Sequence, residues 1–170
     1  MTDHRSTTSI RAKHDRRASE IIDIYVGPRL QFITPQRENG DDYCLVKVEI
    51  PAGITVPVHS HPDRETFYVL SGELQGNANG GWQTFQAGDV FDVADGVKHA
   101  IRNAYHEPLS LLMVTTSKLG QFFRDVGRPF EDAPLPAPTA ADFERFTSVA
   151  SAYGYWMGGP ADNAEYGIDT

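Results

Sequence analysis

Alternating apolar and polar residues recur along most of the chain, in short runs that turn residues separate. In the clearest run, residues 43–50, every second position is apolar, as in a strand with one face against a core. A shorter run at residues 66–70 ends in a turn at Ser71-Gly72. The return strand from residue 73 to 76 and the next strand at 82–85 flank the Asn- and Gly-rich segment 77–81, which is typical of a hairpin loop. Residues 109–116 are apolar on both faces and indicate a buried closing strand. Strands of this length, with turn signals at intervals of roughly 8–12 residues, predict an all-β barrel or sandwich.

The pattern changes to helical spacing near the end of this region. It predicts a short helix from Lys118 to near Gly127, followed by a connector at residues 129–138 that contains four prolines. Thr139 is the predicted N-cap of a second helix that ends at Gly154. We expect this second helix to pack against the outside of the barrel.

These patterns divide the chain into three parts. Residues 1–20 are polar and rich in arginine, so they cannot bury a core and predict a flexible tail. Residues 21–117 form the predicted barrel, and residues 118–170 form a helical, proline-rich extension. Within the extension, the aromatic segment 155–157 is expected to cap one barrel mouth or to contact a partner chain.

Composition excludes several classes of protein. The 170 residues are 40% hydrophobic and 22% charged, which is ordinary for one globular domain. The net charge of −8 argues against broad nucleic-acid binding. Cys44 is the only cysteine and is expected to be a small core residue, so no intrachain disulfide can form. No apolar run approaches the ~20 residues that span a bilayer, and the N-terminus lacks a secretory segment; we expect no membrane association and a cytoplasmic protein.

One stretch places three metal-binding side chains close together. His59, His61 and Glu65 fall on odd-numbered positions that continue through Phe67 and Val69. This alternation fits a strand with one face turned into a barrel. Two imidazoles and a carboxylate on one face can hold a transition metal and leave positions open. The alternative is a surface His-Ser-His turn beside an ordinary charged loop.

A second stretch, residues 88–103, adds a third histidine. It contains a Gly-Asp turn, an apolar alternation and a second turn at Asp95-Gly96 before His99, which shares a strand face with Ile101 and Asn103. If this hairpin lies beside the first in an antiparallel barrel, His99 can complete a site of three nitrogens and one oxygen. His106 lies in a predicted exposed turn and is left out of the site.

Together the two stretches resemble the two motifs of the cupin family. The first motif is matched position for position and the second in all but one, because Ala94 stands where proline is usual. The matching residues are Gly53, His59, His61, Glu65 and Gly72 in the first motif, and Gly88, Gly96, His99 and Asn103 in the second. The resemblance covers roughly residues 40 to 117. It implies a double-stranded β-helix (jelly-roll) barrel with a metal held by His59, His61, Glu65 and His99.

The predicted site favours a particular kind of ligand. Its residue types suit one divalent transition metal, which could be iron, nickel, manganese, copper or zinc. Glu65 can be a ligand or, alternatively, the general base for a substrate hydroxyl. Arg64 and Lys98 point away by parity, which disfavours a phosphosugar. The side chains that share the inward face predict a pocket for an apolar or aromatic molecule: Phe67, Val69, Phe91, Ile101 and Met113.

Within the cupins, the chain is similar to small quercetin dioxygenase-like proteins. The similarity lies in the run HSHPDRETFYVLSGEL and in the Gly120–Phe123 helix, proline-rich link and final helix that follow. It implies metal-dependent dioxygenation of a flavonol-like or other enolic or aromatic molecule, with O2 as co-substrate and Glu65 as the catalytic group. Two alternatives stay open: a non-redox cyclase or isomerase of secondary metabolism, and a non-catalytic small-molecule-binding cupin. We also expect a homodimer, to which the N-terminal strand and Tyr155-Trp156 could contribute.

Overall fold

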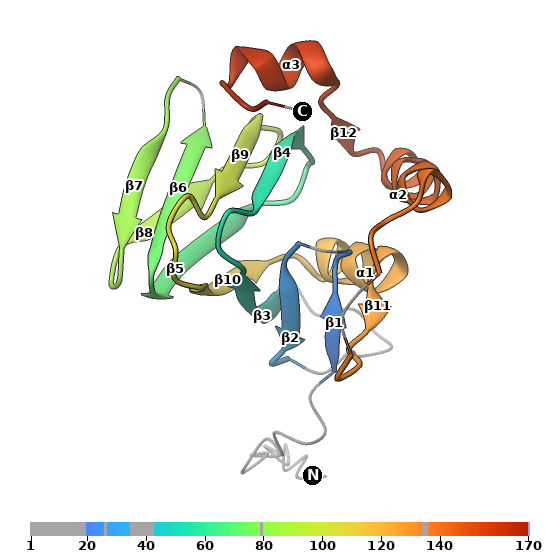
Figure 1. Ribbon diagram of the computed structural model, residues 1–170, viewed down its shortest axis with the longest axis horizontal. Coiled ribbons are helices and arrows are strands. Elements are labelled where there is room, and N and C mark those ends of the chain that lie inside the picture. Colours follow the sequence, from blue (N-terminus) through green and yellow to red (C-terminus); the bar gives the residue numbers. More distant parts are fainter. Residues whose placement is uncertain (1–19, 26, 35–42, 79, 134–135, 170) are drawn as a thin grey trace, which may run out of the picture.

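The structure is a computed structural model, and it describes residues 20–25, 27–34, 43–78, 80–133 and 136–169. The tail expected at residues 1–20 therefore lies outside the described residues, except for Glu20. Two antiparallel sheets form the body of the protein, and three helices follow them in the chain (Figure 1).

One sheet has seven strands in the order β11-β1-β2-β3-β10-β5-β8, and the other has five in the order β12-β4-β9-β6-β7. The bounds of the twelve strands are β1 Ile21–Asp23, β2 Arg29–Phe32, β3 Cys44–Ile50, β4 Thr55–Ser60, β5 Glu65–Ser71, β6 Glu73–Ala78, β7 Gln83–Gln86, β8 Val90–Val93, β9 His99–Arg102, β10 Leu109–Thr115, β11 Arg128–Pro129 and β12 Trp156–Met157. The expected all-β jelly-roll fold with a small C-terminal helical extension is confirmed.

The core lies between the two sheets, where the alternating positions of the strands meet. Val46 and Val48 of β3 are Cα partners of Met113 and Leu111 of β10, and all four side chains are buried. Cys44 is also buried in this core, as its place in the alternation predicts. Such pairs of apolar side chains are the unit that stabilises a sheet face, so the pattern seen in the sequence accounts for this part of the fold.

The expectation of one strand running through the first histidine motif is wrong. β4 ends at Ser60 in the five-stranded sheet, and β5 begins at Glu65 in the seven-stranded sheet. Pro62, which has no backbone N–H to donate to a ladder, lies in the crossing. The carbonyl oxygen of His61 instead accepts a hydrogen bond from the Gly96 N–H at 2.8 Å. The odd-numbered side chains therefore face the interior from two different sheets.

A bulge in β4 sets which of its side chains face inward. Val56 is opposite Ile101 and His59 is opposite His99, so β4 advances by three positions where β9 advances by two. Val58, between them, packs on the outer side in a cluster with Ala100 and Ile168. The extra residue lets Val56 and His59 both face the interior although they differ in parity.

The helices are α1 Ser117–Val126, α2 Ala140–Tyr153 and α3 Pro160–Glu165. Thr116 caps α1, because its side chain accepts the Leu119 N–H at 3.1 Å. Thr139 caps α2 in a capping box with Asp142, and Gly154 ends α2 in the left-handed conformation with φ of 75°. The predicted boundaries of both helices are therefore confirmed.

The C-terminal extension adds an edge strand to each sheet. β11 pairs with β1 through Ile22 and Pro129. β12 pairs with β4, where Met157 is the Cα partner of His59. In Figure 1, β12 leads from α2 to α3 along the edge of β4. Residues 118–170 are therefore joined to the barrel by backbone hydrogen bonds and not only by side-chain packing.

Candidate metal centre

Four residues from four places in the chain meet in the barrel interior. His59 comes from β4, His61 from the crossing after it, Glu65 from the start of β5 and His99 from the start of β9. One nitrogen or oxygen atom of each lies within 4.8 Å of the corresponding atoms of the others. The ring centroids of His59 and His99 are 4.2 Å apart, and those of His61 and His99 are 5.3 Å apart. The structure thus brings together all four residues that the sequence predicts as ligands.

Backbone carbonyls orient two of the three imidazoles. The Nδ1 atoms of His59 and His99 lie 2.8 Å from the Pro57 oxygen and 2.9 Å from the Val97 oxygen, respectively. A carbonyl oxygen can only accept, so each Nδ1 carries the proton in this arrangement. The opposite nitrogen, Nε2, is then free to bind at the centre. In His99 this Nε2 lies 2.9 Å from Oε2 of Glu65.

The protonation states of two ligands already suit a cation. Burial, followed by the neighbouring His99, lowers the pKa of His59 to about 3, so its imidazole is neutral at pH 7. Burial acts to raise the pKa of Glu65, but the adjacent imidazoles of His61 and His99 outweigh it and lower that pKa, so the carboxylate is ionised. Metal ligation requires neutral imidazole and ionised carboxylate.

His61 differs from the other two histidines. Burial acts to lower its pKa, but the Glu65 carboxylate outweighs burial and raises it. Its Nε2 lies 3.2 Å from Glu65 Oε2 without the geometry of a hydrogen bond, and neither buried ring nitrogen has a hydrogen-bond partner among the described residues. Buried polar atoms without partners need an explanation. A cation at the centre would provide one for Nε2, and the set of three imidazoles and one carboxylate is compatible with a transition metal.

An apolar cavity of about 110 Å³ opens from these four residues. Of the side chains predicted to form the pocket, Phe67, Ile101 and Met113 line it. Val69 and Phe91 are not among its lining residues; both are buried elsewhere in the same core cluster.

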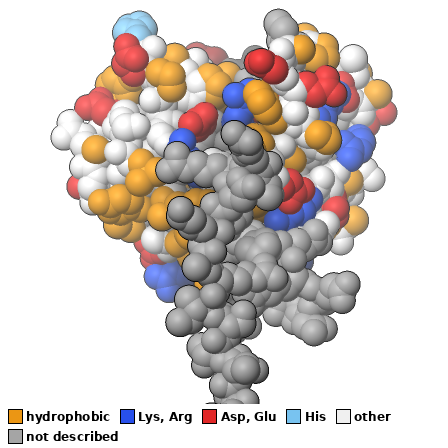
Figure 2. Space-filling model, turned by 90° about the horizontal axis from the view of Figure 1, so that it is seen from below, with side chains coloured by type: hydrophobic (Ala, Val, Ile, Leu, Met, Phe, Trp, Pro, Cys, Tyr) orange, Lys and Arg blue, Asp and Glu red, His pale blue; other side chains and the backbone are white. Residues whose placement is uncertain are grey.

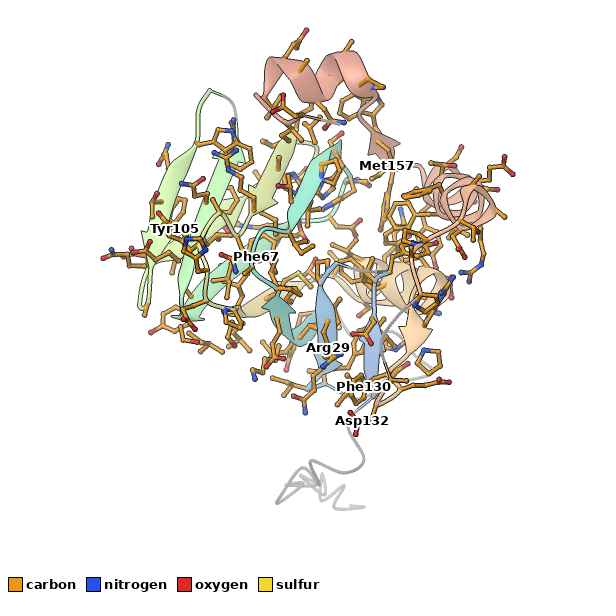
Figure 3. All side chains as sticks on the ribbon, in the orientation of Figure 1. Arg29, Phe67, Tyr105, Phe130, Asp132 and Met157 are labelled. Atoms are coloured by element: carbon orange, nitrogen blue, oxygen red, sulfur yellow. The ribbon has the colours of Figure 1, made fainter. Side chains whose placement is uncertain are left out.

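Much of the rest of the lining comes from the two helices and from segment 155–157, which we expected to cap one barrel mouth or to contact a partner chain. α1 contributes Leu119 and Phe122, α2 contributes Phe146, and the β12 region contributes Tyr155 and Met157. Figure 3 places Phe67 between the two sheets and Met157 on β12, at the side where α2 lies. The second helix, which we expected to pack against the outside of the barrel, thus also contributes a side chain to the cavity. The helical spacing of the aromatic residues was visible in the sequence, but which barrel opening they cover was not.

Two polar residues beside the centre were also missed. Asp63, in the crossing between β4 and β5, and Tyr155 are both buried. The ring of Tyr155 lies 5.3 Å from that of His61. Arg64 and Lys98, in contrast, are exposed: Arg64 pairs with Asp92, and Lys98 lies over the Trp156 ring. The centre therefore has no cationic side chain among the residues that line the cavity.

Comparisons with known proteins agree with this fold and site. A family model described as a cupin domain matches residues 46–115. The chain is 28% identical over 125 residues to quercetin 2,3-dioxygenase of Bacillus subtilis strain 168, a match that covers 72% of this chain and 37% of that protein. The chain thus spans well under half the length of this curated relative.

Solved structures give the same result. An RmlC-like cupin from Shewanella frigidimarina NCIMB 400 is 26% identical with a TM-score of 0.52, over 64% of this chain and 90% of that one. A sugar phosphate isomerase of the cupin superfamily from Silicibacter pomeroyi DSS-3 is 19% identical with a TM-score of 0.52, over 62% and 75% of the two chains; this likeness concerns the fold alone.

The fold is a jelly-roll barrel in which three histidines and a glutamate face an apolar cavity. The domain match over residues 46–115 and the likeness to a solved cupin structure support a protein of the cupin superfamily. Among the described residues, no helix is both long and apolar enough to cross a membrane.

Proposed function

We propose that the protein is a metal-dependent cupin enzyme that acts on a small enolic or aromatic molecule, with dioxygenation as the reaction best supported. The observation that carries the proposal is the convergence of His59, His61, Glu65 and His99 at the end of an apolar cavity. The similarity to a quercetin 2,3-dioxygenase supports the reaction type. One divalent metal among iron, nickel, manganese, copper and zinc would be held by these four residues.

A bound metal would supply a Lewis acid and, if it is redox-active, a means of reacting with O2. The chain itself supplies the surroundings. The walls, which include Phe67 and Ile101, are apolar and favour an apolar molecule over water. The ionised carboxylate of Glu65 faces the same space and is the group that we propose to take a proton from a substrate hydroxyl.

The size of the cavity narrows the substrate class. An engineered protein cavity of about 150 Å³ holds benzene, and the cavity here measures about 110 Å³. This volume favours an enolic or aromatic molecule of about one ring over a three-ring flavonol. Among the described residues on the face shown in Figure 2, Lys and Arg side chains lie among acidic ones.

The deciding experiment is oxygen uptake by protein reconstituted with each metal in turn. A panel of one-ring enols and phenols, with a flavonol for comparison, is incubated in air and without O2. Oxygen uptake that requires both metal and substrate supports the proposal. Glu65→Gln should abolish this uptake, and Asp92→Asn should leave it unchanged. Turnover that continues without O2 or with zinc would indicate the cyclase or isomerase, and binding without any turnover would indicate the binding protein.

We also propose a homodimer. The N-terminal strand β1 is paired on both sides, with β11 and β2, whereas β12 is the edge strand of its sheet and pairs only with β4. Exposed apolar side chains also lie on the outer face of β5 and β8, where Tyr68 and Val90 are Cα partners and Leu70 follows. Light scattering after gel filtration tests the proposal: wild type should be a dimer, and Tyr68→Asp should shift it toward monomer while Phe143→Asp does not.

A further inference from the structure

Asp63 is a buried carboxylate that the proposed chemistry does not use. Its side chain is 3% exposed and lies between two of the four ligands in the sequence. One carboxylate oxygen, Oδ1, accepts a hydrogen bond from the hydroxyl of Thr116, the N-cap of α1. The other oxygen, Oδ2, has no hydrogen-bond partner among the described residues. A buried ionisable group with one unpartnered oxygen points to a second contact that forms under other conditions.

The unpartnered oxygen faces an unpartnered nitrogen. Oδ2 of Asp63 lies 3.9 Å from Nδ1 of His61, the ring nitrogen on the side away from Glu65. In His59 and His99 the corresponding Nδ1 already bonds to a backbone carbonyl. A histidine that binds a metal almost always donates its other ring N–H to a carboxylate, carbonyl or water. Of the described residues near His61, Asp63 is the acceptor in that position.

Tyr155 brings a third unpartnered group to the same place. Its side chain is 7% exposed, and its hydroxyl has no hydrogen-bond partner among the described residues. Burial, and after it the adjacent Asp63 carboxylate, raise the pKa of the Tyr155 hydroxyl, which therefore stays protonated and able to donate. Among the described residues that line the cavity, Tyr155 is the only polar one apart from the four candidate ligands.

We propose that Asp63 is a positioning residue of the metal centre, whose Oδ2 accepts hydrogen bonds from both His61 Nδ1 and the Tyr155 hydroxyl once the four ligands hold a metal. The inference rests on the proposed metal site. Closing the gap from 3.9 Å to an ordinary hydrogen bond takes a shift of about 1 Å. We call α1, α2 and the β12 region, which line the cavity, the C-terminal cover. Because Tyr155 directly precedes β12 and Thr116 caps α1, the same carboxylate would connect two segments of this cover with the ligand His61.

Zinc affinity, measured by chelator competition, tests the role of Asp63. Loss of an outer-shell partner of this kind weakens metal binding by about 10- to 100-fold, and we expect that loss for Asp63→Asn. The matched control is Asp92→Asn. It removes an exposed carboxylate of β8 that accepts hydrogen bonds from Arg64 and Thr66, and it should change the zinc affinity by less than about twofold. The cobalt(II) absorption spectrum should also change in Asp63→Asn and stay the same in the control.

Tyr155→Phe, with Tyr153→Phe as its control, tests the link to the cover. Tyr153 belongs to the same aromatic cluster, but its hydroxyl bonds to Asp125 instead. Zinc should slow amide hydrogen exchange at residues 155–158 in wild type and in Tyr153→Phe. In Tyr155→Phe this protection should be reduced by roughly tenfold, since one hydrogen bond to a charged group is lost. Equal protection in all three proteins would overturn this part of the inference.

Wild-type protein provides a measurement that does not depend on a variant's folding. In zinc-loaded protein, a long-range ¹H–¹⁵N spectrum should show His61 with a slowly exchanging proton on Nδ1 and with metal on Nε2. If wild type binds zinc but Asp63→Asn binds it equally well, or if Nδ1 carries no protected proton, this inference fails and the metal site stands. If wild type binds no metal at all, the proposed function fails and the inference fails with it.

Discussion

His59 and His99 are direct Cα partners across β4 and β9, and their ring centroids are 4.2 Å apart. Forty residues separate them in the sequence, so their contact depends on the register of two strands. The bulge at Pro57 and Val58 sets that register. Since a shift of one residue would turn a side chain to the other face of the sheet, the candidate centre is sensitive to any change in this pairing.

Removing one of these partners should abolish metal binding. Wild-type protein that is loaded with metal and then separated from unbound metal should contain close to one ion per chain by elemental analysis. We expect His99→Ala to weaken binding by more than about 100-fold, which exceeds the loss of an outer-shell partner. His106→Ala, which removes an exposed histidine outside the site, is the control and should keep full occupancy. Equal loss in both variants, or none in either, would contradict the assignment.

Bound metal should also stabilise the fold. A ligand that binds only the folded state at 100 times its dissociation constant adds about 2.7 kcal/mol to the free energy of unfolding. Urea unfolding of wild type with and without zinc should show this gain, and a chelator should reverse it. In Glu65→Ala the gain should be smaller, because the three histidines remain but the carboxylate is gone. An undiminished gain in this variant would mean that Glu65 does not bind the metal.

Gly158 should not tolerate a side chain. A Cβ at this position would lie 2.4 Å from Cγ1 and 2.9 Å from the carbonyl oxygen of Val58, where the Gly158 N–H bonds to β4. We expect Gly158→Ala to lower the free energy of unfolding by about 1–3 kcal/mol through overpacking. At Gly159 the nearest atom to an added Cβ is 3.7 Å away, so Gly159→Ala should lose less than about 1 kcal/mol. Similar losses in the two variants would mean that close approach of β12 to β4 is not the cause.

Phe122 should be the most important side chain of the C-terminal cover. Its ring lies 4.9 Å from that of Tyr155 and 5.7 Å from that of Phe146, and the side chain is buried. Phe122→Ala should cost about 3–5 kcal/mol of unfolding free energy. Phe143, on α2, is 56% exposed, and Phe143→Ala should change stability by less than about 1 kcal/mol. If Phe143→Ala proved the more damaging, the packing of α2 would have to be revised.

The cap of α2 should make stability depend on pH. Bonds from the backbone and side chain of Thr139, together with Arg128, lower the pKa of Asp142 to about 2. In the unfolded chain the pKa is about 3.9, so the ionised carboxylate stabilises the fold above that value, and the contribution is lost as the pH falls toward 2. Asp142→Asn should therefore shift the denaturant midpoint strongly at pH 6 and much less near pH 2.5. The same shift at both pH values would show that charge plays no part.

The sequence by itself determined the strands, the helix ends and the four candidate ligands. These depend on local rules: alternation at residues 43–50, the capping pair Thr139 and Asp142, the αL residue Gly154, and histidines at spacings that resemble a known motif. Local rules also misled at one point, since the odd-numbered run from His59 to Glu65 reads as a single strand although it crosses between sheets.

Only the tertiary structure decided what surrounds the centre. The position of a side chain along the barrel axis decides whether it reaches the cavity. On β5, Phe67 lines the cavity and Val69 does not. Tyr155 lies beside His61, and Phe122 lines the same cavity, because α1 and the segment that leads into β12 cover the barrel mouth; both residues are more than fifty positions from His61 in the sequence. Sequence periodicity carries the direction of a side chain within its own element, but not the distance to an element elsewhere in the chain.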